Sequence, residues 1–269
     1  MARIEQISSL SNPKVKGIAA LAQKKARVES GQFVVEGLQL VGFGVERGWE
    51  LDMLVFKDGQ RYQHGGQAVY DTALQATKQA FAVTGAVLEK LVRKDNPQGV
   101  IGVFKQKTMP LAEVELNTDV WVVLEEVRDP GNLGTIIRTA DAVGAKGVIM
   151  VGNSTDVWAP EVLRATMGSI FHAPVVLTSR EAFLAWKAGQ DAVMVGTHLR
   201  GDCDYREVAD KVQNKAVLLA MGTEQSGLSD EMADACDVLT KIAMRGGAES
   251  LNLAIATGVM LYEIFRSIK

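Results

Sequence analysis

The sequence predicts an α/β protein whose larger part is a mostly parallel sheet with helices on both faces. Continuous apolar runs recur at wide spacing in the second half of the chain, a pattern typical of strands that are buried on both faces. Helical patterns lie between several of these runs, which favours parallel strand connections. With 269 residues, 47% of them hydrophobic, the chain can form one large domain or two ordinary ones.

Before residue 107, short strand-like runs alternate with helix-like ones, which predicts a small α/β domain. The strand-like runs are Phe33–Val35, Met53–Phe56 and Val100–Phe104, and the helix-like runs are Gly37–Arg47, Ala73–Ala80 and Ala86–Arg93. The polar stretch Lys105–Asp119 contains Pro110 and few large apolar residues. We therefore expect domains over residues 1–106 and 119–269, joined by a linker over 107–118.

In the second domain the expected strands are Val120–Leu124, Gly147–Val151, Ala192–Val195, Ala216–Ala220 and Val238–Ile242. Ligands of such sheets bind beyond the carboxyl ends of the strands. The loops that follow these runs are therefore the places to look for chemistry.

Composition narrows the class of protein. No apolar run approaches the roughly 20 residues of a membrane helix, and the first residues lack the apolar stretch of a signal peptide, so we expect a cytoplasmic protein. Cys203 and Cys236 have no CxxC spacing, and His64, His172 and His198 lie far apart. We therefore expect neither a metal site nor a disulfide framework.

Charge is distributed unevenly along the chain. The net charge is −3, but residues 1–107 carry 15 Lys and Arg against 10 Asp and Glu. The basic residues near the start include Lys14, Lys16, Lys24, Lys25 and Arg27. Such a basic segment can neutralise RNA phosphates, although a solvated surface explains the charge equally well. Charge alone permits an RNA partner without indicating one.

The first informative loop, Leu124–Gly144, leaves a strand, turns at Asp129-Pro130-Gly131-Asn132 and begins a helix. Asn132 is a good N-cap candidate, because its side chain can accept a hydrogen bond from a free backbone N–H. Apolar side chains from Leu133 to Val143 recur at helical spacing. At about 100° per residue, Arg138 points roughly opposite this stripe, toward a ligand, a partner chain or water.

The second loop, Ala220–Ser229, follows a strand of almost pure Val, Leu and Ala. Its glycines Gly222 and Gly227 flank one carboxylate, Glu224. The loop has neither the GK[ST] of a Walker loop nor the GxGxxG of a dinucleotide site. Its glycines are explained by tight turns or by the close approach of a ligand.

The third loop lies within Lys241–Arg266. A strand is expected to end at Ile242, and Gly246 and Gly247 follow it. A helix is expected to begin near Ser250, so the polar residues Ser250 and Asn252 lie at its amino end. The apolar residues beyond them are spread around much of the helix. More than one neighbour must cover such a helix, and either a second subunit or the chain's own core can do so.

Together these loops are more specific than any one of them. DPGNLGTIIRTADAVGA, MGTEQSGLS and IAMRGGAESLNLAIATG resemble, in order and at fitting distances, the three motifs of the SpoU (TrmH) family, RNA ribose 2′-O-methyltransferases of the SPOUT superfamily. The N-terminal half resembles that family's small RNA-binding domain at GQFVVEGLQLV and NPQGVIGV.

This resemblance implies a trefoil-knotted α/β methyltransferase domain that works as a homodimer, and an N-terminal α/β domain that binds the RNA substrate. S-adenosylmethionine would bind against the second and third motifs, near Gly222, Ile242 and Leu251. The catalytic group carried over by position comprises Asn132, Arg138, Glu224, Ser250 and Asn252.

The third motif departs from the family pattern at Ala243, where proline is usual, and at Leu253-Ala254, where Val-Ser is common. These changes affect the expected shape of the cofactor pocket but leave the proposed catalytic side chains in place.

The family proposal makes the arginine a general base. A free guanidinium, with a reference pKa of at least about 12.5, costs roughly 7 kcal/mol to deprotonate at pH 7. We therefore expect Arg138 at least to orient the 2′-hydroxyl and stabilise developing negative charge, with Glu224 holding its guanidinium group.

Three other classes of protein remain to be weighed. A catalytically silent RNA-binding or ribosome-assembly protein would lack Arg138, Asn132 or Asn252, and all three are present. An NAD-dependent oxidoreductase would need GxGxxG, and a nucleotide-metabolising enzyme would need a lysine near the second loop. The sequence has neither feature. We expect a methyltransferase acting on ribosomal rather than transfer RNA, in either a housekeeping or an antibiotic-resistance role.

Overall fold

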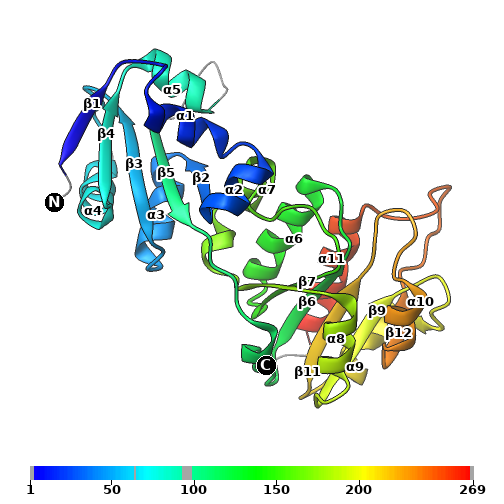
Figure 1. The fold of residues 1–269 in the computed structure, drawn as a ribbon. Coiled ribbons are helices and arrows are strands. Elements are labelled where there is room, and N and C mark those ends of the chain that lie inside the picture. Colours follow the sequence, from blue (N-terminus) through cyan, green and yellow to red (C-terminus); the bar gives the residue numbers. More distant parts are fainter. Residues whose placement is uncertain (1–2, 64, 93–98, 267–269) are drawn as a thin grey trace. The chain divides into compact units, whose positions relative to one another are not determined.

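The chain forms two compact units in the computed structural model, which describes residues 3–63, 65–92 and 99–266 (Figure 1). The first unit comprises Met1–Gln106 and Trp158–Phe171, and the second comprises Lys107–Val157 and His172–Lys269. The segment Trp158–Phe171 thus packs with the first unit, whereas the boundaries expected from the sequence place it in the second domain.

The first unit is built on a five-stranded sheet in the order β1-β4-β3-β5-β2. Strands β1, β4 and β3 are parallel, and β5 is antiparallel to both β3 and β2. Its elements are β1 Ile4–Ile7, α1 Pro13–Ala20, α2 Lys24–Ser30, β2 Gln32–Glu36, α3 Leu38–Glu46, β3 Leu51–Lys57, α4 Gly66–Ala76, β4 Gln79–Val83, α5 Gly85–Val92, β5 Val100–Lys105, α7 Pro160–Thr166 and the 3₁₀ turn η2 Ser169–Phe171.

An aromatic cluster explains why Trp158–Phe171 joins the first unit. The ring of Trp158 lies 4.7 Å from that of Phe33, measured between centroids, and Phe171 lies 5.3 Å from Trp49 and 5.2 Å from Phe104. Burial of large aromatic side chains dominates core energetics. These rings therefore fix the segment to the unit.

The second unit is a parallel seven-stranded sheet in the order β10-β12-β9-β11-β6-β7-β8. Its elements are η1 Leu111–Glu113, β6 Val120–Glu125, α6 Pro130–Ala142, β7 Gly147–Val151, β8 Val175–Thr178, α8 Arg180–Lys187, β9 Ala192–Thr197, β10 Cys203–Asp204, η3 Tyr205–Glu207, α9 Val208–Lys211, β11 Ala216–Met221, α10 Asp230–Asp234, β12 Val238–Lys241 and α11 Leu253–Phe265. The predicted parallel sheet is confirmed.

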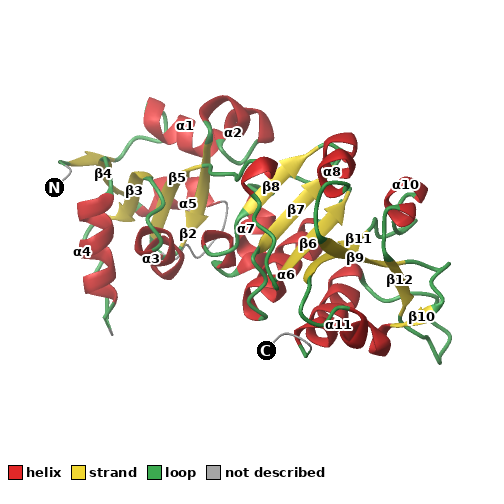
Figure 2. Cartoon of the chain, turned by 90° about the horizontal axis from the view of Figure 1, so that it is seen from below, coloured by secondary structure: helices red, strands yellow, loops and turns green. Residues whose placement is uncertain are grey.

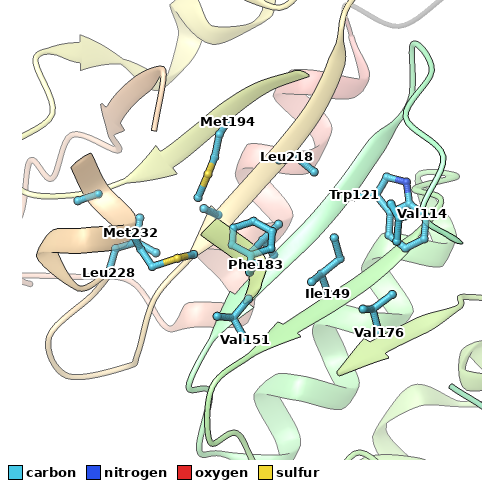
Figure 3. Packing of buried hydrophobic residues seen from close by; sticks show 13 residues of the cluster. Val114, Trp121, Ile149, Val151, Val176, Phe183, Met194, Leu218, Leu228 and Met232 are labelled. Atoms are coloured by element: carbon cyan, nitrogen blue, oxygen red, sulfur yellow. The ribbon is translucent and has the colours of Figure 1, made fainter. Parts of the chain in front are cut away.

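Helices cover both faces of this sheet. Figure 2 shows α8 and α10 on one face and α6 and α11 on the other. On the first face, alternate strand residues such as Trp121 and Ile149 pack with Phe183 of α8 and Met232 of α10 (Figure 3). Alternation follows from the two-residue period of a strand, and burial on both faces explains the continuous apolar runs.

The stretch expected to be a linker belongs to the packed body of the second unit. Val114 is buried, and Leu111 packs against the same cluster as Trp121. The backbone N–H of Met109 donates to the carbonyl of Val175 at 2.9 Å. Lys105, at the start of the wider polar stretch and before the expected linker, is part of β5. Although the stretch is mostly polar, its few apolar side chains are enough to pack it against the core of the second unit.

Several element boundaries differ from those expected. The helix expected over Ala73–Ala80 ends at Ala76, and β4 begins at Gln79. Strand β12 ends at Lys241, one residue before Ile242. Helix α5 is described over Gly85–Val92; Arg93, like the first residues of NPQGVIGV, lies outside the described residues. No helix within the described ranges has the length and apolar character needed to cross a membrane.

Candidate active site

Three loops meet at the carboxyl edge of the second unit's sheet, where ligands of parallel α/β sheets bind. They follow β6, β11 and β12 and lead into α6, α10 and α11 respectively. Because β6 and β11 are adjacent strands, the loops after them begin side by side. They are the loops that carry the three motifs.

The first loop is ordered by a cap that sequence reasoning placed wrongly. Asp129, not Asn132, is the N-cap of α6, and its Oδ1 accepts a hydrogen bond from the backbone N–H of Asn132 at 2.7 Å. Pro130 suits the first helical position, where the missing N–H costs nothing. The side chain of Asn132 is consequently available for contacts with other loops.

Glu224 joins the first loop to the second. Its carboxylate accepts hydrogen bonds from the backbone N–H groups of Arg128 (3.4 Å) and Asp129 (3.1 Å), and from Nδ2 of Asn132 (3.2 Å). Burial raises the pKa of Glu224, but these hydrogen bonds together bring it below its ordinary value of 4.5. The group is therefore a carboxylate at neutral pH.

Asn252 connects the third loop to the first. Its Nδ2 donates to Oδ1 of Asn132 at 2.8 Å, and its own Oδ1 accepts from the backbone N–H groups of Ala254 and Ile255. Asn252 is thus the N-cap of α11, which begins at Leu253 rather than near Ser250. We call Glu224, Asn132 and Asn252 the polar triad. It links residues 92 and 120 positions apart in sequence.

Arg138 does not join the polar triad within one chain. It is exposed on α6, and no hydrogen bond or ion pair connects it to another described residue. Six residues beyond Asn132, it lies about 9 Å further along the helix and on a different face. The expectation that Glu224 holds its guanidinium is therefore wrong within a single chain, because Glu224 bonds the first loop instead.

The second loop closes on itself around Gly222. Backbone hydrogen bonds join Thr223 and Gly227 in both directions, at 2.9 and 3.1 Å. A Cβ on Gly222 would lie 1.9 Å from the carbonyl carbon of Gly227, so only glycine fits. Gly227 itself has φ +71°, a conformation that favours glycine.

The third loop offers unpaired polar groups. From Ala243 to Leu251 every residue is exposed, and none of them makes a hydrogen bond to another described residue. Ser250, expected to be catalytic, is among them. Met244 and Leu251 expose 36% of their surface, and Ile242 is half-buried.

These features fit S-adenosylmethionine. Its adenine ring needs apolar cover, which Ile242, Met244 and Leu251 can supply, and its polar edges need backbone partners, which the third loop leaves available. A cavity of about 830 Å³ lies instead at the amino edge of the sheet, near Thr118, Ala192 and Ala216. That edge carries none of the three motifs.

Sequence reasoning missed a second polar cluster at the carboxyl edge. Glu125, the last residue of β6, is only 2% exposed and contacts Arg180 and Ser229. The available signal was a carboxylate directly after the apolar run ending at Leu124. Its partners lie 55 and 104 residues away, so no local pattern identified them.

Two known protein families match the chain. Residues 119–262 match the SpoU rRNA Methylase family, and residues 12–102 match an MRM3-like substrate binding domain. The first match covers more than half of the chain and includes all three motif loops. The second covers most of the five-stranded sheet of the first unit.

Relatives of known sequence or structure agree with these matches. The chain is 34% identical over 92% of its length, and 87% of the relative's, to the 23S rRNA (uridine(2479)-2′-O)-methyltransferase of Streptomyces viridochromogenes. It is 28% identical, over 97% and 99%, to the 23S rRNA (guanosine(2553)-2′-O)-methyltransferase of Bacillus subtilis. An AdoMet-bound rRNA methyltransferase from Sinorhizobium meliloti superposes with a TM-score of 0.91, at 42% identity over 99% of both chains. The chain therefore belongs to the SpoU rRNA methylase family.

Proposed function

We propose that this protein transfers a methyl group from S-adenosylmethionine to a ribose 2′-hydroxyl of ribosomal RNA. The observation that carries the proposal is the polar triad, which joins the three motif loops at the edge where the family's chemistry is expected. S-adenosylmethionine supplies an electrophilic methyl group on a sulfonium. The chain's own residues have to hold the cofactor, orient the hydroxyl and accommodate its proton.

The cofactor would be held by the second and third loops. Gly222 starts a loop whose backbone is tightly closed, and Ile242 and Leu251 offer partly exposed apolar surface. Ala243, where the family usually has proline, leaves one further backbone N–H available in this loop.

Within the catalytic group, Asn132 and Asn252 present amides that would position the ribose or its neighbouring phosphate. Glu224 keeps both loops in place. Ser250, exposed near the start of α11, would contact the RNA. Arg138 would orient the 2′-hydroxyl and stabilise charge that develops on its oxygen, as a preorganised electrostatic group.

The separation of Arg138 from the polar triad supports a homodimer. Because Arg138 is exposed and makes no hydrogen bond or ion pair with the described residues of its own chain, a second copy packed against α6 and α11 would bring Arg138 of one protomer to the site of its partner. We also propose the trefoil knot that the family resemblance implies. The parallel sheet with β11 between β9 and β6 is consistent with it.

The first unit would bind the RNA. Two of the basic residues expected to gather phosphates are engaged elsewhere. Arg27 is 3% exposed and donates from Nη1 to the carbonyl of Leu21, while Lys14 forms an ion pair with Glu5. Lys16, Lys24 and Lys25 remain exposed. The rRNA substrates named for the two relatives favour ribosomal over transfer RNA, and with it work in the cytoplasm.

The test is transfer of labelled methyl from S-adenosylmethionine to ribosomal RNA from a strain that lacks the gene. We expect label in a nuclease-resistant 2′-O-methylated dinucleotide with the wild type and none with Arg138→Ala. If Arg138→Lys keeps near-normal turnover at neutral pH, the specific guanidinium role is wrong. If the wild type binds cofactor and RNA without transfer, the alternative of a catalytically silent RNA-binding protein gains support.

A further inference from the structure

A buried carboxylate anchors the end of the second loop. Glu125 Oε2 accepts a hydrogen bond from the backbone N–H of Ser229 at 2.8 Å, and Oε1 accepts one from the Ser229 hydroxyl at 2.7 Å. Ser229 is the last residue of the loop and the N-cap of α10. The loop that begins at Gly222 is therefore held at its far end by the last residue of β6.

Arg180 supplies the cation for this carboxylate. Its Nε donates to Glu125 Oε1 at 2.8 Å, while Nη1 lies 3.3 Å from Glu231 and Nη2 lies 3.8 Å from Glu126. Arg180 is the first residue of α8. One guanidinium thus connects the carboxyl end of β6, the start of α8 and the first turn of α10.

The same contacts continue toward the polar triad. Glu126, with φ +50°, also binds Arg128 at 3.0 Å. The backbone N–H of Arg128 in turn donates to Glu224. A continuous path of polar contacts therefore runs from Arg180 through the first loop to the carboxylate that holds Asn132.

Stability alone is a weak explanation for such a pair. Removing a carboxylate from water costs several kcal/mol, and buried ion pairs can often be replaced by apolar residues without loss of stability. An ion pair with hydrogen bonds instead fixes the relative orientation of the groups that it joins. Here the hydrogen bonds of Glu125 go to Arg180, the first residue of α8, and to Ser229, the N-cap of α10 at the end of the second motif loop.

We infer that Glu125 and Arg180 are positioning residues that hold the loops after β6 and β11 in the arrangement in which Glu224 meets Asn132. This inference rests on the proposed methyl transfer for its effect on turnover. Its effect on the loops themselves does not depend on that function.

The test is a double-mutant cycle of Glu125→Gln and Arg180→Gln. We expect each single variant to lower kcat about tenfold and to weaken S-adenosylmethionine binding by a similar factor, with the KM for RNA changed less because the first unit is proposed to supply most RNA contacts. The double variant should lose no more turnover or cofactor affinity than the worse single variant, because both substitutions break the same Glu125–Arg180 interaction. Amide hydrogen exchange at residues 222–229 should accelerate in all three, while exchange in β11 stays slow.

Lys146→Gln is the matched control. Lys146 pairs with Asp119 at 3.6 Å at the amino edge of the same sheet, so this variant loses the same charge without touching the loops. It should keep wild-type kcat, cofactor affinity and exchange rates. If Arg180→Gln does not fold because Glu125 is left without its cation, the double variant, which removes both charges, gives the same information.

Three results would overturn the inference. The first is single variants that neither slow turnover nor speed loop exchange. The second is losses that multiply in the double variant as independent effects, and the third is a Lys146→Gln variant that alters the loops to the same extent. A wild type that methylates no RNA would contradict the proposed function alone, because cofactor affinity and exchange at residues 222–229 still decide the role of Glu125 and Arg180.

Discussion

At the scale of single residues, the site depends on side chains that satisfy the backbone of another loop. Glu224 accepts two backbone N–H groups from the first loop as well as the Asn132 amide. Hydrogen bonds to an ionised acceptor are stronger than neutral ones. The charge of Glu224 therefore matters to the structure of the site whatever part it takes in catalysis.

The depressed pKa of Glu224 sets the sign of a pH dependence. Because its folded-state pKa lies below the ordinary 4.5, its contribution to the free energy of unfolding is complete above pH 4.5 and is lost as the pH falls through the folded-state value. Denaturation of the wild type and Glu224→Gln across this range should give a stability difference that is constant above pH 4.5 and shrinks below it. A difference that grows on acidification would contradict the assignment.

Gly222 is predicted to tolerate no side chain. A Cβ there would overlap the backbone of Gly227 and Leu228, and backbone cannot move as a flexible side chain can. Gly222→Ala should therefore open the second loop and abolish measurable S-adenosylmethionine binding by calorimetry. The control is Gly189→Ala, whose added Cβ would lie 3.7 Å from its nearest neighbour. Cofactor affinity preserved in Gly222→Ala would show that the closed loop is unimportant for binding.

Sequence reasoning found the members of the polar triad through the motifs, and the structure brings them into contact. Their catalytic roles stay predictions. It placed the N-cap of α6 at Asn132 instead of Asp129, because both residue types are good caps. Only Pro130, which suits the first helical position, identifies Asp129 as the cap. It could not find the partners of Glu125, because pairing over 55 residues leaves no periodic signal.

At the scale of secondary structure elements, two helices begin within the site. The caps of α6 and α11 are Asp129 and Asn252, so the residues that start these helices also adjoin or form the polar triad. Losing a cap typically costs about 1 kcal/mol. At this site the loss should also displace the side chain that the cap orders.

We predict that Asp129→Ala lowers the free energy of unfolding by about 1 kcal/mol and lowers methyl transfer by more than that destabilisation explains, because Asn132 loses its anchor. Denaturant unfolding and turnover should be measured on the same samples. Asn12→Ala removes the cap of α1 in the first unit, where Oδ1 accepts from Lys14, and should leave the turnover rate unchanged. Equal turnover in both variants would contradict the role given to Asp129.

The strands that the sequence predicted are those with continuous apolar runs, and the missed ones are short, lie at a sheet edge or closely follow a helix. Strand β8, for example, is apolar over three residues but has only four residues and lies at the edge of its sheet. Strand β1 is IEQI and mostly exposed at the edge of its sheet, while β10 has two residues. Strand β4 follows α4 so closely that its alanines extended the helical pattern. Edge position and short length weaken periodicity, because fewer residues are constrained by burial.

At the scale of the whole molecule, the division of the chain follows packing rather than sequence order. Trp158 and Phe171 lie within the second half of the sequence, yet their rings pack with Phe33 and Trp49 of the first unit. Composition marks no boundary there. The aromatic contacts reveal it, and those of Trp158 with Phe33 and of Phe171 with Trp49 join residues more than a hundred positions apart.

The last prediction concerns assembly. On α11, Ile255 and Tyr262 each expose 57% of their surface and Phe265 exposes 48%. Ile255 and Tyr262 are seven residues apart and so lie on nearly the same face of the helix. Exposed apolar surface of this kind marks an interaction site, and the proposed role of Arg138 in the site of a partner chain predicts that the site is completed by a second copy.

We therefore expect light scattering to give a mass twice the 29.0 kDa of one chain. Tyr262→Asp should shift this mass toward a single chain and abolish methyl transfer, since each site would lose the guanidinium of its partner. Leu177→Asp, at a residue 52% exposed on β8, places the same charge on exposed apolar surface away from α11 and should leave the dimer intact. A monomeric wild type that still methylates RNA would require Arg138 to reach the triad of its own chain, and with it a rearrangement of α6.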